Sequence, residues 1–128
     1  MLKDKTVLIV DDEHKNIFAL SAVLKSKGVK CITASDGIQG IKTLQEFMHV
    51  DVVLMDIMMP EMDGYEAIRR IRNDTDHKNI PIIALTANAM KGDREKCLEA
   101  GASDYVSKPV DIDKLTEKMI FLLLTNSQ

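Results

Sequence analysis

The sequence predicts an α/β fold in which a five-stranded parallel sheet is covered by helices on both faces. Short apolar runs rich in β-branched residues alternate with segments of helical periodicity five times along the chain. Strict alternation of this kind favours parallel strands joined by right-handed crossovers. The length of 128 residues suits one domain with one core and is too short for two.

Five segments are predicted to be strands because each is short and apolar. In chain order they are Thr6–Val10, Val29–Thr33, Val52–Met55, Pro81–Leu85 and Asp104–Val106. The first is apolar enough to be buried on both faces, whereas the second is more polar and predicts a strand at the sheet edge. The proline of the fourth stands at the strand entrance, where a missing backbone donor is tolerated.

Five helices are predicted between and after these strands, the fourth over Lys91–Ala100, because apolar residues recur three and four positions apart. The expected inward residues of the other helices are Ile17, Leu20 and Leu24, then Ile38, Ile41 and Leu44, then Ile68 and Ile71, and finally Leu115, Met119, Leu122 and Leu123. The expected end signals are Gly28 and Gly101 after the first and fourth helices, the caps Asp36 and Asp111, and the turn Asp63-Gly64.

Composition and charge exclude several classes of function. The net charge is −3 with acids and bases interspersed, which argues against direct contact with nucleic acid. Arg69, Arg70 and Arg72 form the one local basic group, interpreted as a solvated helix face. No apolar run approaches the ~20 residues that cross a bilayer. The two cysteines, Cys31 and Cys97, are expected to be buried thiols, so the chain is expected to be cytoplasmic, with no insertion into the membrane.

Polar side chains follow four of the predicted strands. Asp11 and Asp12 follow the first strand, Asp56 the third, Thr86 the fourth and Lys108 the fifth. In a parallel sheet these positions meet beyond the carboxyl ends of the strands, where ligands bind. Three carboxylates converging there would repel one another, a conflict that a divalent cation removes. Mg²⁺ suits an all-oxygen site of this kind. A carboxylate next to Mg²⁺, together with a hydroxyl and an ammonium, makes a phosphoryl-transfer site, in which Asp56 would be the nucleophile.

Four segments, VLIVDDE, VVLMDIMMPEMDGYE, PIIALTANA and DYVSKP, together and in this order resemble the motifs of the response-regulator receiver domain. The similarity runs from about Lys5 to Leu123, so residues 1–128 are expected to form a single receiver domain with its core over about 5–123. The resemblance implies a doubly wound, flavodoxin-like fold with strand order 2-1-3-4-5.

The resemblance also implies roles for the acidic residues. Asp56 resembles the phosphoacceptor. Asp12 and Asp56 resemble direct ligands of Mg²⁺, which Mn²⁺ could replace, together with the backbone carbonyl of Met58. Asp11 resembles the residue that holds metal-bound water.

A second set of roles concerns switching and the lifetime of the phosphoryl group. Thr86 and Lys108 resemble the family's hydroxyl and lysine, and Tyr105 its switch aromatic, which rotates inward when Thr86 moves toward the phosphoryl group. The Lys108–Pro109 bond is expected to be cis. Water would reach the phosphorus past Met58 and Asn88, and the large apolar Met58 predicts slow self-dephosphorylation.

The implied function is to accept a phosphoryl group from a histidine kinase or a histidine phosphotransfer domain, with no enzymatic turnover beyond self-phosphorylation and self-dephosphorylation. The segments IMMPEMDGYEAIRRIR and LTANAMKGDREKCLEAGASDYVSKPV look more like receivers attached to hybrid histidine kinases than like those of DNA-binding regulators. Two alternatives are a phosphorylation-independent interaction module and an aspartyl-phosphate phosphatase. The phosphatase would need an Asp-x-Gly-Thr-like motif on the first strand, which Asp11-Asp12-Glu13-His14 does not supply.

The last helix carries more apolar residues than one inward stripe needs, since Ile120, Phe121 and Leu124 add to it. One interpretation is that Phe121 folds over the sheet edge and the others tolerate solvent. The other is that the helix forms a surface for a second copy, a partner or a neighbouring domain.

Overall fold

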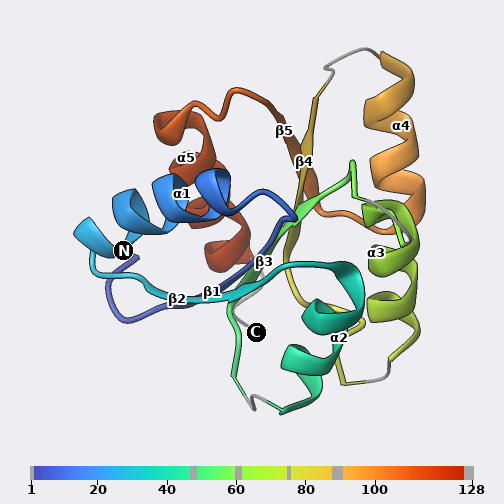
Figure 1. Ribbon diagram of the computed structural model, residues 1–128, viewed down its shortest axis with the longest axis horizontal. Helices are drawn as coiled ribbons and strands as arrows, with labels where there is room; N and C mark the ends of the chain where they lie inside the picture. The colour runs from blue at the N-terminus through green and yellow to red at the C-terminus, as the bar shows by residue number, and fades with distance from the viewer. Residues whose placement is uncertain (1, 47–48, 60–61, 75, 88–90, 126–128) are drawn as a thin grey trace.

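The computed structural model describes residues 2–46, 49–59, 62–74, 76–87 and 91–125, within which five strands alternate with five helices (Figure 1). The strands are β1 (Thr6–Val10), β2 (Lys30–Ala34), β3 (Val52–Asp56), β4 (Ile82–Thr86) and β5 (Asp104–Ser107). The helices are α1 (His14–Ser26), α2 (Gly37–Glu46), α3 (Gly64–Asn73), α4 (Lys91–Ala100) and α5 (Ile112–Thr125). The predicted fold class is therefore confirmed.

The strands form one parallel sheet in the order β2-β1-β3-β4-β5, as the resemblance implies. The more polar β2 lies at one edge, as predicted from its sequence. From β1 the chain continues to β2 on one side of β1, and it then crosses to β3 on the other side. The strand order therefore reverses between β1 and β3. Val10 and Met55 pair in this register, which places the residues after β1 beside the end of β3.

The helices cover the two faces of the sheet in separate groups. Helices α1 and α5 cover one face, and α2, α3 and α4 cover the other (Figure 1). Alternation along β4 shows the division, because Ile82 and Ala84 belong to the core on the α2–α4 side while Ile83 and Leu85 belong to the core on the α1–α5 side. Both faces of the central strands are thus buried, which explains why their sequences are almost entirely apolar.

Strand boundaries differ from the predictions by one residue at several ends. β3 continues to Asp56, which pairs with Leu85, and β5 continues to Ser107, which pairs with Thr86. β4 begins after Pro81, since proline has no donor for the ladder, although its carbonyl still accepts from the Val53 N–H at 2.9 Å. The longer β3 makes Asp56 part of the sheet, so its backbone is fixed by strand pairing.

The predicted inward stripe of α2 is partly wrong. Leu44 is buried and Ile41 packs against the core, but Ile38 is 45% exposed. The helix instead packs Gly40 against the sheet, where an added Cβ would lie 2.8 Å from Val10 Cγ2. This close approach rotates Ile38 toward solvent.

The interpretation of the arginine cluster as a solvated face is wrong for Arg72. Arg69 and Arg70 are exposed, whereas Arg72 is half-buried, and burial lowers the pKa of its guanidinium. The guanidinium donates to the carbonyl oxygens of Ile80 at 2.6 Å and Gly101 at 2.7 Å. Arg72 therefore ties the end of α3 to the segments that precede β4 and β5.

The prediction of buried thiols holds for Cys97, which is fully buried, while Cys31 is half-buried. Among the described residues no helix is long and apolar enough to cross a membrane.

Helix α5 packs through Leu115 and Met119, which are buried, and through Ile120, Leu122 and Leu123, which are partly buried against the same core. Phe121 is 64% exposed and Leu124 is 59% exposed. The interpretation that Phe121 folds over the sheet edge is therefore wrong.

Candidate functional site

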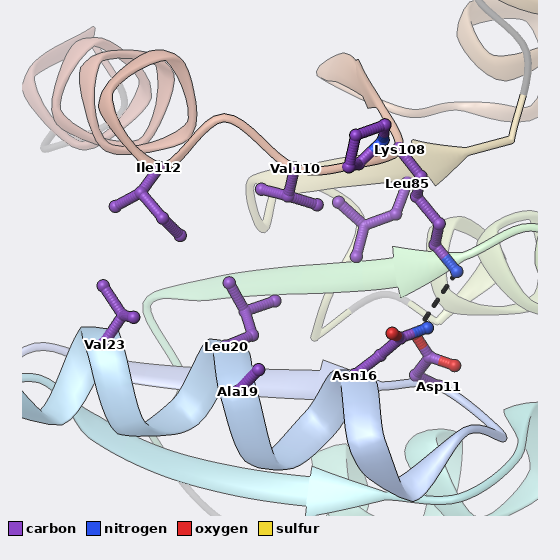
Figure 2. Close-up of a pocket in the computed structure, with 10 residues that line it drawn as sticks. Asp11, Asn16, Ala19, Leu20, Val23, Leu85, Lys108, Val110 and Ile112 are labelled. Carbon is purple, nitrogen blue, oxygen red and sulfur yellow. Dashed lines mark hydrogen bonds and ion pairs between the residues drawn. The ribbon is translucent and has the colours of Figure 1, made fainter.

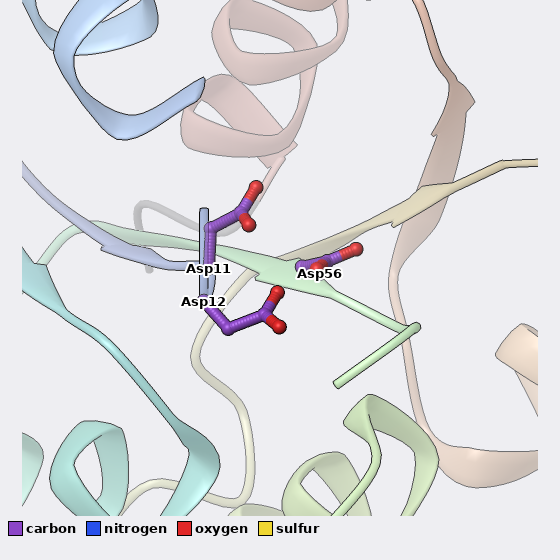
Figure 3. A group of neighbouring side chains, drawn as sticks. All are labelled: Asp11, Asp12 and Asp56. Atoms are coloured by element: carbon purple, nitrogen blue, oxygen red, sulfur yellow. The ribbon is translucent and has the colours of Figure 1, made fainter. Parts of the chain in front are cut away.

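Three carboxylates meet at the carboxyl edge of the sheet. Asp11 and Asp12 directly follow β1, and Asp56 ends β3. Their side chains lie near one another at these strand ends (Figure 3), and one oxygen from each lies within 4.8 Å of the others. Asp11 is 1% exposed and Asp56 is 2% exposed, whereas Asp12 faces solvent. Two buried carboxylates beside an exposed one form an acidic cluster that opens to solvent on the Asp12 side.

Backbone contacts hold these side chains in place. The Asp11 N–H donates to the Ala34 carbonyl at 3.1 Å, which continues the β1–β2 ladder past the strand end. Asp11 Oδ1 accepts from the Glu13 N–H at 2.9 Å, just before α1. Asp56 Oδ1 lies 3.4 Å from the Met58 N–H, which donates to it. Backbone N–H groups within two residues therefore hold both carboxylates.

Lys108 supplies a positive charge to the buried carboxylates. Its Nζ lies 3.0 Å from Asp56 Oδ1 and 3.4 Å from Asp11 Oδ2. Figure 2 shows the Lys108 side chain extending toward the cluster from the segment after β5. The Lys108 N–H donates to the Thr86 carbonyl at 2.6 Å, and the Lys108–Pro109 bond is cis, as the resemblance implies. Lys108 is thus the positively charged partner of Asp56.

Burial and charge determine the pKa of Asp56. Burial raises the pKa of this carboxyl, the hydrogen bond from Lys108 lowers it and the Asp11 charge raises it again, leaving it at about 6 against an ordinary 3.8. Burial alone would lower the pKa of Lys108, but its hydrogen bond and ion pair with Asp56 outweigh this and raise that pKa. One ammonium therefore does not fully compensate the two buried carboxylates.

The other predicted site residues lie around this cluster. Thr86 ends β4 and is 2% exposed. Tyr105 is half-exposed on β5, opposite Ala84. Met58 projects into solvent and is 69% exposed, whereas most of the nearby methionines are core residues. Asn88 lies outside the described residues.

Gly64 has a structural role at this site that the sequence did not reveal. A Cβ added there would lie 2.3 Å from the Asp56 carbonyl oxygen and 2.6 Å from Ile57 Cα. The Gly64 N–H donates to the Ile57 carbonyl at 3.0 Å, and Asp63 caps α3 by accepting from the Glu66 N–H at 3.0 Å. The first turn of α3 therefore packs directly on the backbone of Asp56, so Gly64 is more than a turn residue.

A groove of about 290 Å³ begins at the cluster and runs between α1 and the segment that joins β5 to α5 (Figure 2). Asp11 and Lys108 line its polar end, and Leu20, Val23 and Ile112 line its apolar end. A group bound at the carboxylates would have this groove beside it.

The donor set fits Mg²⁺. All three side chains offer carboxylate oxygens close enough to share one ion, and the exposed Asp12 leaves room for water ligands. Asp11, Asp12 and Asp56 would hold Mg²⁺ between them, and when bound it would offset the excess negative charge of the cluster.

An acidic cluster paired with a lysine, at the edge of a doubly wound sheet where strand order reverses, defines the class of this protein as the receiver domains of two-component signalling. The comparison with protein families agrees, because the response regulator receiver domain model matches residues 7–120. The chain belongs to that family, a family of signalling modules.

Two curated relatives illustrate the contexts of this domain. The sensor histidine kinase RcsC of Escherichia coli strain K12 is 39% identical over 116 residues, which are 91% of this chain but only 12% of RcsC. The polar-differentiation response regulator DivK of Brucella abortus strain 2308 is 34% identical over 113 residues, which are 88% of this chain and 91% of DivK. The chain thus resembles both a small part of a kinase and nearly the whole of a separate regulator.

A solved structure supports the same assignment. The receiver domain of the sensor histidine kinase PA1611 from Pseudomonas aeruginosa PAO1 superposes with a TM-score of 0.86 at 38% identity, covering 94% of this chain and 98% of that one. That structure has a magnesium ion coordinated in its active-site cleft.

Proposed function

We propose that the protein accepts a phosphoryl group on Asp56 from a phosphohistidine, carried by a histidine kinase or a histidine phosphotransfer domain, in a Mg²⁺-dependent reaction. The observation that carries this proposal is the burial of Asp56 at the end of β3, with Lys108 Nζ at 3.0 Å and two further carboxylates in the same cluster. The proposed unit is a single cytoplasmic receiver domain over residues 1–128, with no turnover of an external substrate. The resemblance to RcsC and PA1611 favours a hybrid histidine kinase as its source.

The chain's own residues account for the steps of the transfer. A bond forms between an Asp56 oxygen and phosphorus while the bond from phosphorus to the donor's imidazole nitrogen breaks, and the nitrogen keeps the electron pair. Lys108, which contacts Asp56, would bind one phosphoryl oxygen, and the Thr86 hydroxyl would donate to another. The product adds a charge of about −1.5 to −2 near Thr86 and Tyr105, which would then change the exposed surface of β5.

Acetyl phosphate tests this function without knowledge of the natural donor. With Mg²⁺ the chain should gain one acid-stable, base-labile phosphoryl group, which intact-mass spectrometry detects. Chelation of the metal should prevent this phosphorylation. A phosphorylation-independent module would gain none. Continuous release of phosphate from small phosphate esters would instead favour the phosphatase alternative.

The metal ligands are expected to differ in importance. Mg²⁺ should bind weakly even without phosphate, because the chain supplies few of its ligands. Asp11→Ala, which removes a water-mediated contact, should weaken binding by about tenfold. Asp12→Ala should weaken it further, because a direct ligand is lost. Chemical-shift titration with MgCl₂ measures both affinities, and equal binding by the wild type and Asp12→Ala would refute the proposed site.

Met58 is expected to set the lifetime of the phosphoryl group. Met58 lies two residues after Asp56 and its side chain is exposed, so it can shield the phosphorus atom of the phosphoryl group from attacking water. Replacing Met58 with asparagine should speed self-dephosphorylation severalfold, because an amide can orient water that a thioether excludes. Met58→Leu is the matched control and should keep the slow rate. Loss of the labelled phosphoryl group over time gives the rates, and an unchanged rate in Met58→Asn would contradict the shielding role.

We also propose that the exposed Phe121 and Leu124 of α5 belong to a surface for a second copy of the chain or for a neighbouring domain. A surface for a second copy should give self-association in sedimentation of the wild type, with or without beryllofluoride, that Phe121→Ala weakens. A monomer in both states, unaffected by Phe121→Ala, would mean that these residues serve packing or a neighbouring domain.

A further inference from the structure

A lysine of α5 reaches across to β5 and contacts the two residues at the start of that strand. Lys118 Nζ lies 3.0 Å from each carboxylate oxygen of Asp104 and 5.5 Å from the centroid of the Tyr105 ring. Asp104 Oδ1 also accepts from the Tyr105 backbone N–H at 2.8 Å. The ammonium is therefore fixed over the ring by two bonds to a carboxylate that the backbone itself holds in place.

Tyr105 lies between this lysine and the protein core. Its ring packs against the core on the α2–α4 side of the sheet and remains half-exposed. Two hollows flank it, one bounded by Arg94 and Leu98 and the other by Asp111 and Lys114, and Lys118 lines both. The contact with Lys118 therefore holds the ring from the side facing solvent, in a region with room for the ring to move.

We propose that Lys118 is a positioning residue that, together with Asp104, holds Tyr105 in its half-exposed position and so opposes switching at the phosphoryl site. This inference rests on the proposed function. The ammonium is paired with Asp104, so inward rotation of Tyr105 takes the ring away from the cation. An interaction made only in the resting state shifts the equilibrium toward that state, and it lowers the apparent affinity of any ligand that needs the other state.

Fluorine NMR can observe the ring directly. The chain has two tyrosines, so protein labelled with 3-fluorotyrosine gives two signals, and Tyr65→Phe identifies the one from Tyr105. The probe is beryllofluoride with Mg²⁺, which mimics a phosphoryl group on the acceptor carboxylate. The test variant Lys118→Met keeps the aliphatic stem and removes the charge. The matched control is Lys114→Met, an exposed lysine one turn earlier on α5 without an ion-pair partner among the described residues.

Lys118→Met should move the Tyr105 signal toward its beryllofluoride-bound position before any probe is added, and should raise the apparent affinity for beryllofluoride by roughly two- to fivefold. Asp104→Asn, which keeps an oxygen for the Tyr105 N–H, should act in the same direction. Lys118→Arg, which retains the charge over the ring, and Lys114→Met should both behave like the wild type.

The possible failures are distinguishable. If the wild type itself does not bind beryllofluoride in the presence of Mg²⁺, the proposed function fails. If the wild type responds and Lys118→Met and Asp104→Asn match it in both signal position and affinity, Lys118 does not position Tyr105. Weaker beryllofluoride binding by a folded Lys118→Met protein would also overturn the inference, because Lys118 would then support the switched state.

Discussion

Replacing Asp56 with asparagine should abolish phosphorylation by acetyl phosphate. An amide is not a nucleophile toward phosphorus under these conditions, and the two neighbouring carboxylates are placed differently. Asp11 is engaged by the Glu13 N–H and by Lys108, while Asp12 is exposed to solvent. Intact-mass spectrometry after incubation with Mg²⁺ and acetyl phosphate should find one added phosphoryl group in the wild type and none in Asp56→Asn.

Peptide mapping provides the control for this prediction. The phosphoryl group of the wild type should map to the peptide that contains Asp56. A phosphoryl group on Asp12 or another aspartate of the variant, formed at the wild-type rate, would show that the acceptor had been assigned wrongly.

Loss of folding is not expected to complicate this result. The pKa of Asp56 is about 6 in the folded protein against an ordinary 3.8, so the unfolded carboxyl ionises first as the pH rises. The folded state then binds more protons, and the free energy of unfolding falls between about pH 4 and pH 6, by at most about 3 kcal/mol. Asparagine cannot ionise, so without metal the variant should lack this fall and should melt at or above the wild-type temperature near pH 7.

Residues in this site differ in how far the sequence could predict them. Asp11, Asp12, Asp56 and Lys108 follow strands whose apolar runs are plain, and the parallel topology alone brings strand ends together. Sequence reasoning therefore anticipated the cluster and its conflict of charge. It could not anticipate that β3 would extend through Asp56, because that depends on pairing with Leu85.

Features that depend on distances between elements escaped prediction. Arg72 has the sequence context of a surface helix, yet the carbonyls of Ile80 and Gly101 come within its reach only in the folded chain. Lys118 likewise meets Tyr105 only because α5 returns across β5. Ile38 has the right spacing to face inward, and the glycine face of α2 displaces it. Periodicity predicts which residues share a face, whereas the closeness of packing decides which face is buried.

Gly64→Ala should be among the most destabilising single substitutions in the chain. The added Cβ would lie 2.3 Å from the Asp56 carbonyl oxygen and 2.6 Å from Ile57 Cα, and both atoms belong to backbone that cannot rotate away. Forcing atoms into a packed site costs typically about 1–3 kcal/mol, and backbone on both sides places this one at or above the upper end. To relieve the clash, α3 must move off β3, so phosphorylation of the variant should also slow.

Gly92→Ala is the matched control for this prediction, because it is also a glycine in the first turn of a helix but has no atom within 4 Å of the added Cβ. It should leave stability unchanged or raise it by up to about 1 kcal/mol, since alanine favours helix more than glycine does. Urea unfolding of the two variants and the wild type measures the difference. Equal midpoints for Gly64→Ala and Gly92→Ala would mean that α3 does not rest on the backbone of Asp56. A low midpoint for Gly64→Ala alone would show that the acceptor strand and the first turn of α3 are held together by a contact that only glycine permits.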